Sequence, residues 1–294
     1  MRETTIKSYA KITLSLDVTG IREDGYHELE TVMQRVSLVD EVRVRWSEEA
    51  EGINLGCSKP YLPVDERNIA YKAAALMVRE FGAKVPKGGV EIFIEKHIPV
   101  AAGLAGGSGN GAAVMIALNR IWDLGLSTRK LCALSAELGA DVPFCVLIQN
   151  TGYGCALCRG TGTELYPLRN RLKKAVLLVK PPFGVSTKEV YKGIDNCDIT
   201  KRPDTQKIVT ALKKGRQDIL YESMANVLEE YTLSRYSEAE ELKEKIAQET
   251  VAEKVMMTGS GPTIFALFGD LTGARKACDQ MRRAGHTAYW AKMI

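Results

Sequence analysis

Five glycines fall within nine positions, from Gly103 to Gly111, and they carry the clearest chemical signal in the chain. Glycine lets the backbone curl so that consecutive N–H groups point at one anion, and the start of a following helix adds partial positive charge. A strand-like run at 90–94 precedes the glycines, and a helical pattern at 112–124 follows them. Because flexible surface loops are rarely bounded in this way, the pattern predicts a phosphate-binding loop.

Two common phosphate loops do not fit this stretch. A Walker A loop needs Lys-Ser/Thr after its last glycine, whereas Ala112 and Ala113 follow Gly111. The letters Gly107-x-Gly109-x-x-Ala112 satisfy the dinucleotide fingerprint. That fingerprint, however, directly follows a strand and precedes an acidic residue at the end of the next strand. Here about eight residues separate the strand from the loop, and a second helix follows the first. An oxidoreductase is therefore disfavoured.

Composition limits the classes of partner. The 294 residues suit two domains, and the formal charge of +4 comes without a basic stripe, so nucleic-acid binding is not expected. No apolar stretch approaches about 18 residues, and the N-terminus has no signal-peptide core, so no membrane association is expected. No oligomeric state is predicted.

The seven cysteines are odd in number and scattered through apolar segments, which is not a disulfide framework. Cys155 and Cys158 form a lone C-x-x-C with no second pair and no nearby histidine. We interpret them as two buried thiols rather than as a zinc or redox site. A reducing, cytoplasmic location is expected.

The elements that must position the loop can be predicted from periodicity. Alternation predicts strands at 6–16 and 42–46, and Asn68 can cap a helix that Gly82 ends. Further helices are predicted at 112–124 and 128–138.

The second half has a different pattern, with a strand at 175–179 and helical segments from 187 to 248. A hairpin follows at 254–257 and 263–268, then a helix at 272–284 and a strand at 287–291. This order is βαββαβ, the split βαβ arrangement. We place the domain boundary so that the domains are 1–158 and 159–294.

Five segments, in this order along the chain, together resemble the GHMP kinases, a family that includes galactokinase, homoserine kinase and mevalonate kinase. They are AKITL at 10–14, DGYHE at 24–28, PVAAGLAGGS at 99–108, GADVPF at 139–144 and GSGPT at 259–263. The resemblance runs from about residue 5 to about residue 291. It implies an α+β, two-domain fold, with an N-terminal nucleotide-binding domain and a C-terminal ferredoxin-like βαββαβ domain.

The resemblance also implies roles for single residues. Asp141 would be the general base for the acceptor hydroxyl, and Lys11 would stabilise negative charge as that hydroxyl attacks. ATP, with Mg²⁺, would be the phosphoryl donor, and no protein side chain is predicted to bind the metal. The residues implied in ATP binding are Pro99, Val100, Ala101, Ala102, Gly103, Leu104, Ala105, Gly106, Gly107, Ser108, Gly109, Asn68 and Lys96.

The segments at 10–14, 24–28 and 139–144, together with that at 259–263, resemble the family members whose acceptor is a cytidine diphosphate derivative of a branched polyol. Tyr26 and His27 would hold the cytosine, and Thr13 and Thr187 would line the substrate side. Taken alone, Asp141 would be a structural carboxylate at a loop, Lys11 a solvated strand residue and His27 a surface histidine. Their joint occurrence with the glycine motifs favours the functional interpretation.

Two departures from the family pattern keep alternatives open. Thr13 stands where the family usually has Asn, so a GHMP kinase for another small alcohol is an alternative. Gly109 replaces a serine whose hydroxyl can help to hold Mg²⁺ in related kinases. A non-catalytic metabolite-binding relative is the third possibility, which the presence of both Lys11 and Asp141 disfavours.

Overall fold

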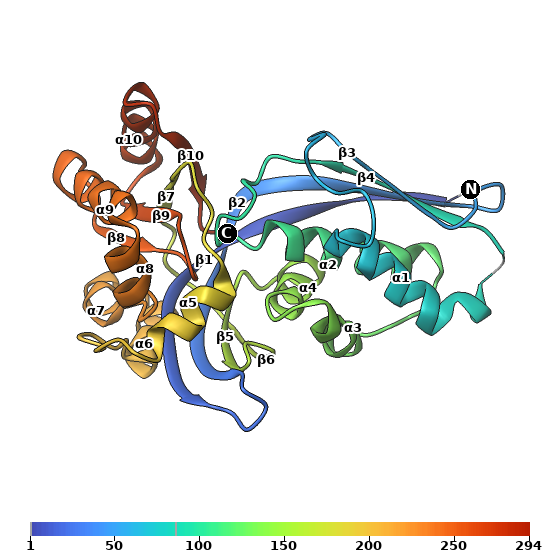
Figure 1. Ribbon diagram of the computed structural model, residues 1–294, viewed down its shortest axis with the longest axis horizontal. Helices are drawn as coiled ribbons and strands as arrows, with labels where there is room; N and C mark the ends of the chain where they lie inside the picture. Colours follow the sequence, from blue (N-terminus) through green and yellow to red (C-terminus); the bar gives the residue numbers. More distant parts are fainter. Residues whose placement is uncertain (1, 86) are drawn as a thin grey trace. The chain divides into compact units, whose positions relative to one another are not determined.

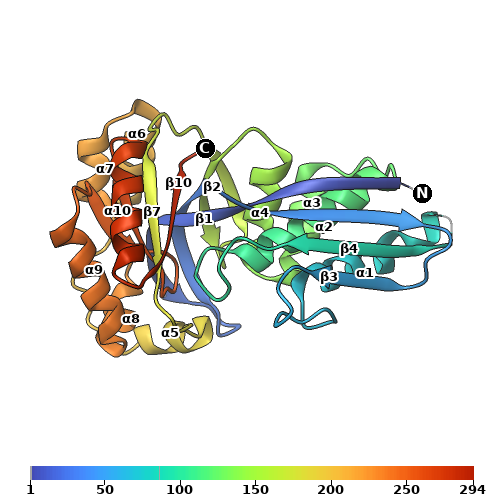
Figure 2. The same ribbon diagram turned by 90° about the horizontal axis from the view of Figure 1, so that it is seen from above.

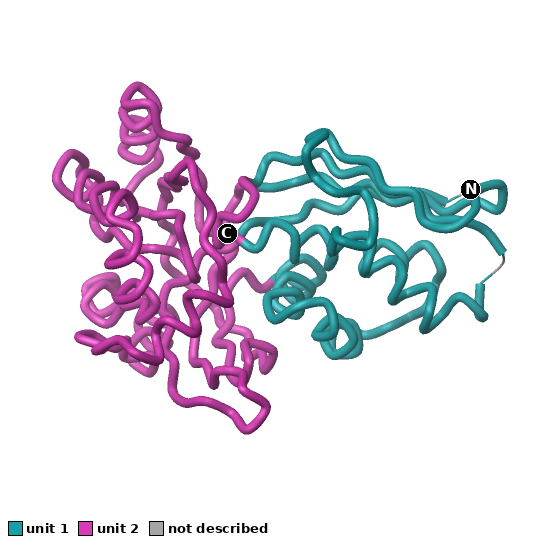
Figure 3. Tube along the Cα trace, viewed as in Figure 1, with its two compact units in different colours: residues 1–10, 39–98, 105–152 teal, residues 11–38, 99–104, 153–294 magenta. Residues whose placement is uncertain are grey.

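The computed structural model describes residues 2–85 and 87–294, and the chain forms two compact units (Figure 3). Unit 1 comprises residues 1–10, 39–98 and 105–152, and unit 2 comprises residues 11–38, 99–104 and 153–294. The units interleave along the chain because the two long strands β1 (Arg2–Ile21) and β2 (His27–Ser47) contribute residues to both. The boundary at 158/159 stays a prediction, since this division does not consist of one cut.

In unit 1, helices cover a sheet that is built from β4 (Gly89–Glu95) with β3 (Ile53–Cys57) parallel to it and the end of β2 antiparallel to it (Figure 2). Val42, Val44 and Trp46 are buried, and the residues between them are more exposed, as the alternation predicted. The helices are α1 (Ile69–Phe81), α2 (Gly106–Ile121), α3 (Thr128–Ser135) and α4 (Val142–Asn150), with short 3₁₀ helices at Gly82–Lys84 and Ala136–Leu138.

The first helix begins and ends where its residues predicted. The Asn68 side chain accepts a hydrogen bond from the Ala70 N–H at 2.9 Å, which satisfies one of the free N–H groups at the start of α1. Gly82 follows the last helical residue. The buried face of α1 lies in the core of unit 1 and consists of Ala70, Ala73, Ala74, Leu76, Met77 and Phe81.

The second helix begins six residues earlier than predicted. Gly106 is the first residue of α2 and Gly111 lies within the helix, where glycine is less favourable than alanine by about 1 kcal/mol. Close packing explains their presence, because a Cβ at Gly106 would lie 2.9 Å from Ile98 Cγ2 and one at Gly111 would lie 2.7 Å from Ile69 Cγ2. The glycines let α2 approach its neighbours where any side chain would collide.

Unit 2 contains the remainder of the two long strands and a separate four-stranded antiparallel sheet (Figure 1). The first part of β2 pairs with β5 (Cys155–Gly160), which pairs with β6 (Glu164–Leu168). The separate sheet has the order β10-β7-β9-β8. Its strands are β7 (Ala175–Lys180), β8 (Lys254–Met257), β9 (Ile264–Phe268) and β10 (Thr287–Lys292).

The order of that sheet is the ferredoxin-like one, so the βαββαβ prediction is confirmed. The first crossover is enlarged by α5 (Thr187–Ile194), α6 (Thr205–Lys214), α7 (Gln217–Ser223), α8 (Glu229–Arg235) and α9 (Ser237–Glu249). The second crossover is α10 (Leu271–Arg283). Apolar residues of α9 and α10 share one core with the sheet.

Cys155 and Cys158 are buried in β5 as free thiols, which agrees with the interpretation from sequence. Burial raises the pKa of Cys155 to about 12, because an apolar environment disfavours the thiolate. Such a thiol is chemically inert at neutral pH. Among the described residues, no helix combines the length and the apolar character that a membrane crossing requires.

Candidate active site

The first part of the glycine segment, residues 99–104, belongs to unit 2 and packs on the turn at 258–261. Gly103 has a φ of 68°, in the left-handed region that favours glycine. A Cβ on Gly103 would lie only 2.4 Å from the carbonyl oxygen of Thr258 and 3.1 Å from that of Gly261. Glycine is therefore required here by both conformation and space, because the segment at 99–108 packs closely on the GSGPT turn at 259–263.

The second part of the segment starts α2 in unit 1. Ala105 has a φ of 56°, and it turns the chain into the helix whose first residues are Gly106, Gly107, Ser108 and Gly109. Within the described residues, no side chain caps this N-terminus and no acidic residue stands in its first turn. The first N–H groups of a helix have no intrahelical partner, so this end is suited to an anion such as a phosphate.

Lys96 lies beside this helix start, in a buried polar network that periodicity does not reveal. Asp40, which is 0% exposed, forms an ion pair with the Lys96 ammonium. Its Oδ1 accepts hydrogen bonds from the N–H groups of His97 and Ile98 at 2.7 and 2.8 Å, and its Oδ2 accepts one from Asn110 Nδ2 at 2.9 Å. One carboxylate therefore ties the end of β2, the segment after β4 and the helix α2 together.

The position of the Lys96 ammonium follows from that network. A Cβ on Gly106 would lie 2.9 Å from Lys96 Nζ, so the ammonium rests against the first residue of α2. Lys96 is thus near the candidate phosphate site, and Asp40 holds it there. Asn68, the other predicted ATP residue of this unit, uses its side chain to cap α1 and to donate to Pro63 O at 2.8 Å.

At Gly109, the space that a side chain would fill is occupied by the Ser8 hydroxyl. A Cβ at Gly109 would lie 2.5 Å from Ser8 Oγ, so the Ser8 hydroxyl fills the place where a longer side chain would stand. Ser8 accepts a hydrogen bond from Asn110 Nδ2 at 3.2 Å, and Gln149 Nε2 donates to Gly109 O at 3.1 Å. Glycine at this position therefore permits a direct contact between β1 and α2.

Asp141 directly precedes α4 in unit 1, at the N-cap position. Its side chain does not cap that helix, and Pro143 stands in the first turn. Residues 142–148 are all buried, whereas Asp141 itself is partly exposed. The rigid helix behind it thus holds a solvent-accessible carboxylate at its N-terminal end, a geometry suited to a general base.

Lys11 is buried in unit 2, with only 4% of its surface exposed, so the reading as a solvated strand residue is wrong. Its Nζ donates to Thr13 Oγ1 at 3.2 Å, and its backbone N–H donates to Leu104 O at 3.1 Å. A Cβ on Gly259 would lie 3.1 Å from Lys11 Nζ. The ammonium is therefore enclosed by Thr13 and by the turn that contains Gly259.

Thr258 connects these segments through its hydroxyl. Its Oγ1 accepts a hydrogen bond from the Thr13 N–H at 3.1 Å and donates one to Gly103 O at 3.4 Å. Ser260, in the same turn, shares a hydrogen bond of 2.9 Å with Thr187 Oγ1 at the start of α5. Unit 2 thus gathers Lys11, Thr13 and Thr187 around one turn, which places these three predicted residues together.

His27 lies in an aromatic and acidic setting that sequence reasoning missed. Its Nε2 is 2.8 Å from Asp195 Oδ1, and its ring lies 5.2 Å from that of Tyr191 between centroids. Tyr26 is 66% exposed, in the turn that the Asp24 carboxylate closes by accepting the Tyr26 N–H at 3.0 Å. His27 thus lies between a tyrosine of α5 and the carboxylate that directly follows this helix. Only the spacing of Tyr191 and Asp195 could have indicated this setting from the sequence.

Comparison with known protein families identifies the class of protein to which the chain belongs. The family profile of the GHMP kinases N terminal domain matches residues 68–148, and that of the GHMP kinases C terminal domain matches residues 208–287. Both halves of the chain therefore carry the sequence of ATP-dependent kinases of this class.

Full-length relatives narrow this class. A 4-diphosphocytidyl-2-C-methyl-D-erythritol kinase of Clostridium botulinum (strain Eklund 17B / Type B) is 44% identical over 277 residues, which cover 94% of this chain and 95% of the relative. One from Clostridium novyi (strain NT) is 41% identical over 98% of this chain and 99% of the relative. A crystal structure of a 4-(cytidine 5'-diphospho)-2C-methyl-D-erythritol kinase superposes with a TM-score of 0.79 at 32% identity, covering 99% of each chain. The chain belongs to the 4-diphosphocytidyl-2-C-methyl-D-erythritol kinases of the GHMP kinase family.

Proposed function

We propose that the chain phosphorylates the 2-hydroxyl of 4-diphosphocytidyl-2-C-methyl-D-erythritol with ATP, releasing ADP. This reaction is a step of isoprenoid precursor synthesis by the methylerythritol phosphate route. The observation that carries the proposal is the uncapped, glycine-rich start of α2, which offers N–H groups to phosphates. The full-length relatives named for this activity support the choice of acceptor.

In the proposed mechanism, the glycine segment at 99–109 binds the phosphates of ATP. The first N–H groups of α2 have no side-chain cap, and the N-terminus of this helix favours the negative charge that increases during transfer. Lys96, held by Asp40, adds an ammonium next to Gly106. Phosphoryl transfer needs mainly positioning and charge stabilisation, and these groups supply both.

Asp141 takes the proton of the acceptor hydroxyl as its oxygen attacks the γ-phosphorus. The bond from the γ-phosphorus to the bridging oxygen of ADP then breaks, and the proton remains on the Asp141 carboxyl group until solvent removes it. Lys11 stabilises negative charge on the attacking oxygen. A buried ammonium suits this role, because few water molecules screen its charge.

Mg²⁺ is proposed to bind through the phosphates of ATP. Within residues 2–85 and 87–294, no group of three or more His, Cys, Asp or Glu side chains could hold a metal ion. Mg²⁺ keeps several of its water ligands and binds readily to phosphate oxygens, which is the basis for this part of the proposal. Bound in this way, Mg²⁺ would neutralise phosphate charge.

The cytidine of the acceptor is proposed to bind at Tyr26, His27 and Tyr191. Stacking of a base on an aromatic ring contributes about 1–3 kcal/mol, and the exposed Tyr26 ring is available for it. Asp195 fixes the orientation of His27 by accepting from its Nε2. Thr13 and Thr187 are proposed to contact the polyol part of the substrate.

A second candidate function is phosphorylation of another small alcohol, which Thr13 favours. Its hydroxyl already accepts from Lys11, so it offers the acceptor less hydrogen bonding than an amide would. Both candidates are tested by measuring ADP formation with a panel of alcohols that includes the cytidylyl substrate, mevalonate and homoserine. Turnover of the cytidylyl compound alone supports the proposal. A preference for another alcohol would refute it, and no ADP formation with any alcohol would favour a non-catalytic relative.

A further inference from the structure

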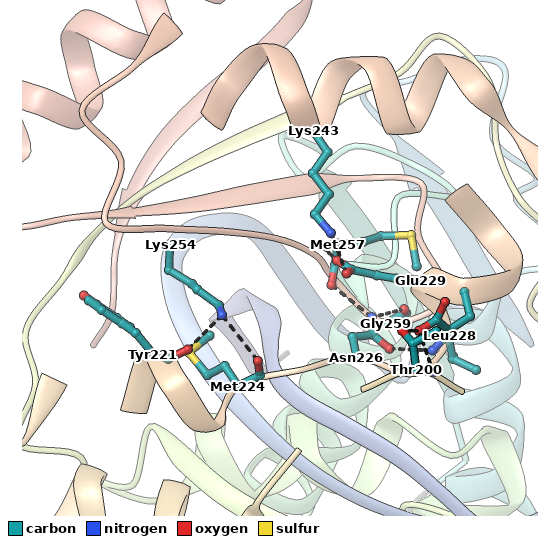
Figure 4. Close-up of polar contacts among 11 residues, drawn as sticks. Thr200, Tyr221, Met224, Asn226, Leu228, Glu229, Lys243, Lys254, Met257 and Gly259 are labelled. Atoms are coloured by element: carbon teal, nitrogen blue, oxygen red, sulfur yellow. Dashed lines mark hydrogen bonds and ion pairs between the residues drawn. The ribbon is translucent and has the colours of Figure 1, made fainter. Parts of the chain in front are cut away.

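The turn at 257–261 is attached to a segment of unit 2 in which the sequence shows no motif, residues 225–229. Figure 4 shows Asn226 and Glu229 of this segment facing Met257 and Gly259. Since a Cβ on Gly259 would lie 3.1 Å from Lys11 Nζ, whatever holds this turn also defines the enclosure of the Lys11 ammonium.

Asn226 makes this attachment with its side-chain amide nitrogen, while its amide oxygen is bound within its own segment. It is 3% exposed, and its Nδ2 donates to Met257 O at 3.0 Å and to Gly259 O at 2.8 Å. Its Oδ1 accepts from the Leu228 N–H at 3.1 Å. An amide provides two donors and an acceptor, whereas the isosteric carboxylate of Asp provides none of the donors. Of these two side chains of equal shape, only Asn can donate to the carbonyl oxygens of Met257 and Gly259.

Glu229 binds the other backbone group of Met257, its N–H. Its Oε1 accepts from the Met257 N–H at 2.5 Å, and its Oε2 pairs with Lys243 Nζ of α9 at 2.6 Å (Figure 4). Met257 is the last residue of β8, which is an edge strand of the sheet. The outward N–H of an edge strand lacks a partner strand. The Glu229 carboxylate supplies the missing acceptor.

The segment is itself bound to β1, the strand that carries Lys11. Leu16 N donates to Ala225 O at 3.1 Å, and Val227 N donates to Leu16 O at 3.0 Å, so Asn226 forms a parallel bridge with Leu16. A second, direct link runs from the Thr13 N–H to Thr258 Oγ1. The turn is therefore held to β1 at two separate places, one through Thr258 and one through Asn226.

The geometry points to Asn226 and Glu229 as positioning residues for phosphoryl transfer, which they support by fixing the turn that encloses the Lys11 ammonium. This inference rests on the proposed function, in which Lys11 stabilises the attacking oxygen. Displacing a catalytic group by about 1 Å can cost on the order of 10²-fold in rate. A displaced turn should lower kcat and leave the binding of ATP and of the acceptor almost unchanged.

The test compares Asn226→Asp, Glu229→Met and Glu229→Gln with Glu253→Gln as a matched control. Glu253 pairs with Lys174 and Tyr221 in the same unit, and its side chain forms no hydrogen bond or ion pair with the turn. We expect Asn226→Asp to lower kcat per folded molecule by about 10- to 100-fold, with both KM values within about threefold. Glu229→Met should lower kcat by a smaller factor. Glu229→Gln keeps an acceptor for the Met257 N–H, so its kcat should be closer to the wild-type value than that of Glu229→Met.

Hydrogen exchange provides a readout that requires no substrate. In Asn226→Asp, a peptide covering residues 254–263 should exchange faster than in the wild type, while the Glu253→Gln control should leave residues 257–263 unchanged. The inference would be overturned if residues 257–263 of Asn226→Asp exchanged at the wild-type rate, or if its kcat stayed within about threefold of the wild type. It would also be overturned if Glu253→Gln lost as much kcat as Asn226→Asp at an equal loss of Tm. Wild-type turnover of the cytidylyl substrate tests the proposed function separately. Should the wild type prefer another alcohol, the kcat ratios are measured with that alcohol.

Discussion

Replacement of Asp40 by Asn should destabilise the protein strongly, although the two side chains have the same shape. The amide oxygen can still accept from the N–H groups of His97 and Ile98, but an amino group then faces the Lys96 ammonium and the Asn110 amide. Asp40 is 0% exposed and the Lys96 side chain 6%, so the ammonium would lose its partner away from water. Breaking a buried ion pair on one side costs about 3–5 kcal/mol.

The assay is urea unfolding, followed by circular dichroism, of the wild type, Asp40→Asn, Lys96→Met and the double variant. The double variant removes the unpaired charge as well, so it should recover at least about 2 kcal/mol relative to the sum of the single changes. Glu137→Gln, which breaks the exposed pair with Arg79, is the control and should leave the unfolding midpoint unchanged. The buried network would not hold Lys96 as described if the free energy of unfolding of Asp40→Asn lay within about 1 kcal/mol of the wild type. The same conclusion would follow if the effects of Asp40→Asn and Lys96→Met on that free energy were additive.

Three further predictions concern activity. Asp141→Asn should lower kcat by at least about 10²-fold with little change in Tm or ATP affinity, as expected when a positioned base is lost; near wild-type turnover would show that Asp141 is not the base. Tyr26→Ala, His27→Ala and Tyr191→Ala should each raise KM for the cytidylyl substrate by roughly 5- to 150-fold and leave KM for ATP within about twofold, since each removes one ring from the proposed clamp. Steady-state kinetics with cytidylyl and uridylyl substrates measures these KM values, and equal values in the variants and the wild type would contradict the proposed clamp. Gly103→Ala should raise KM for ATP by at least about tenfold, because its Cβ would lie 2.4 Å from Thr258 O at a left-handed φ; unchanged ATP kinetics would argue that the segment does not bind phosphates.

Features that depend on neighbours in sequence could be predicted well. Asn68 and Gly82 mark the ends of α1 because a cap and a C-terminal glycine act within a few residues of the helix. The ferredoxin-like order of the second sheet followed from the alternation of strand and helix patterns along the chain.

Features that depend on tertiary packing could not be predicted in the same way. The sequence pattern predicts a helix start at 112, since glycines disfavour a helix, whereas close packing against Ile69 and Ile98 requires glycines in the first turns of α2. Asp40 stands between a valine and a glutamate and looks like the polar start of a strand. Its importance arises from Lys96, which lies 56 positions further along the chain.

Lys11 illustrates why the functional residues are the ones that local patterns misjudge. A lysine in a strand is normally solvated, and its burial costs free energy unless partners replace the lost water. The Lys11 ammonium donates to Thr13, which is close in sequence, but the turn at Gly259 that encloses it lies far along the chain. The local rule fails at Lys11 because the fold keeps a cation where water is largely excluded. A charge held in that way interacts strongly with a developing negative charge, so the same burial that opposes stability favours the proposed chemistry.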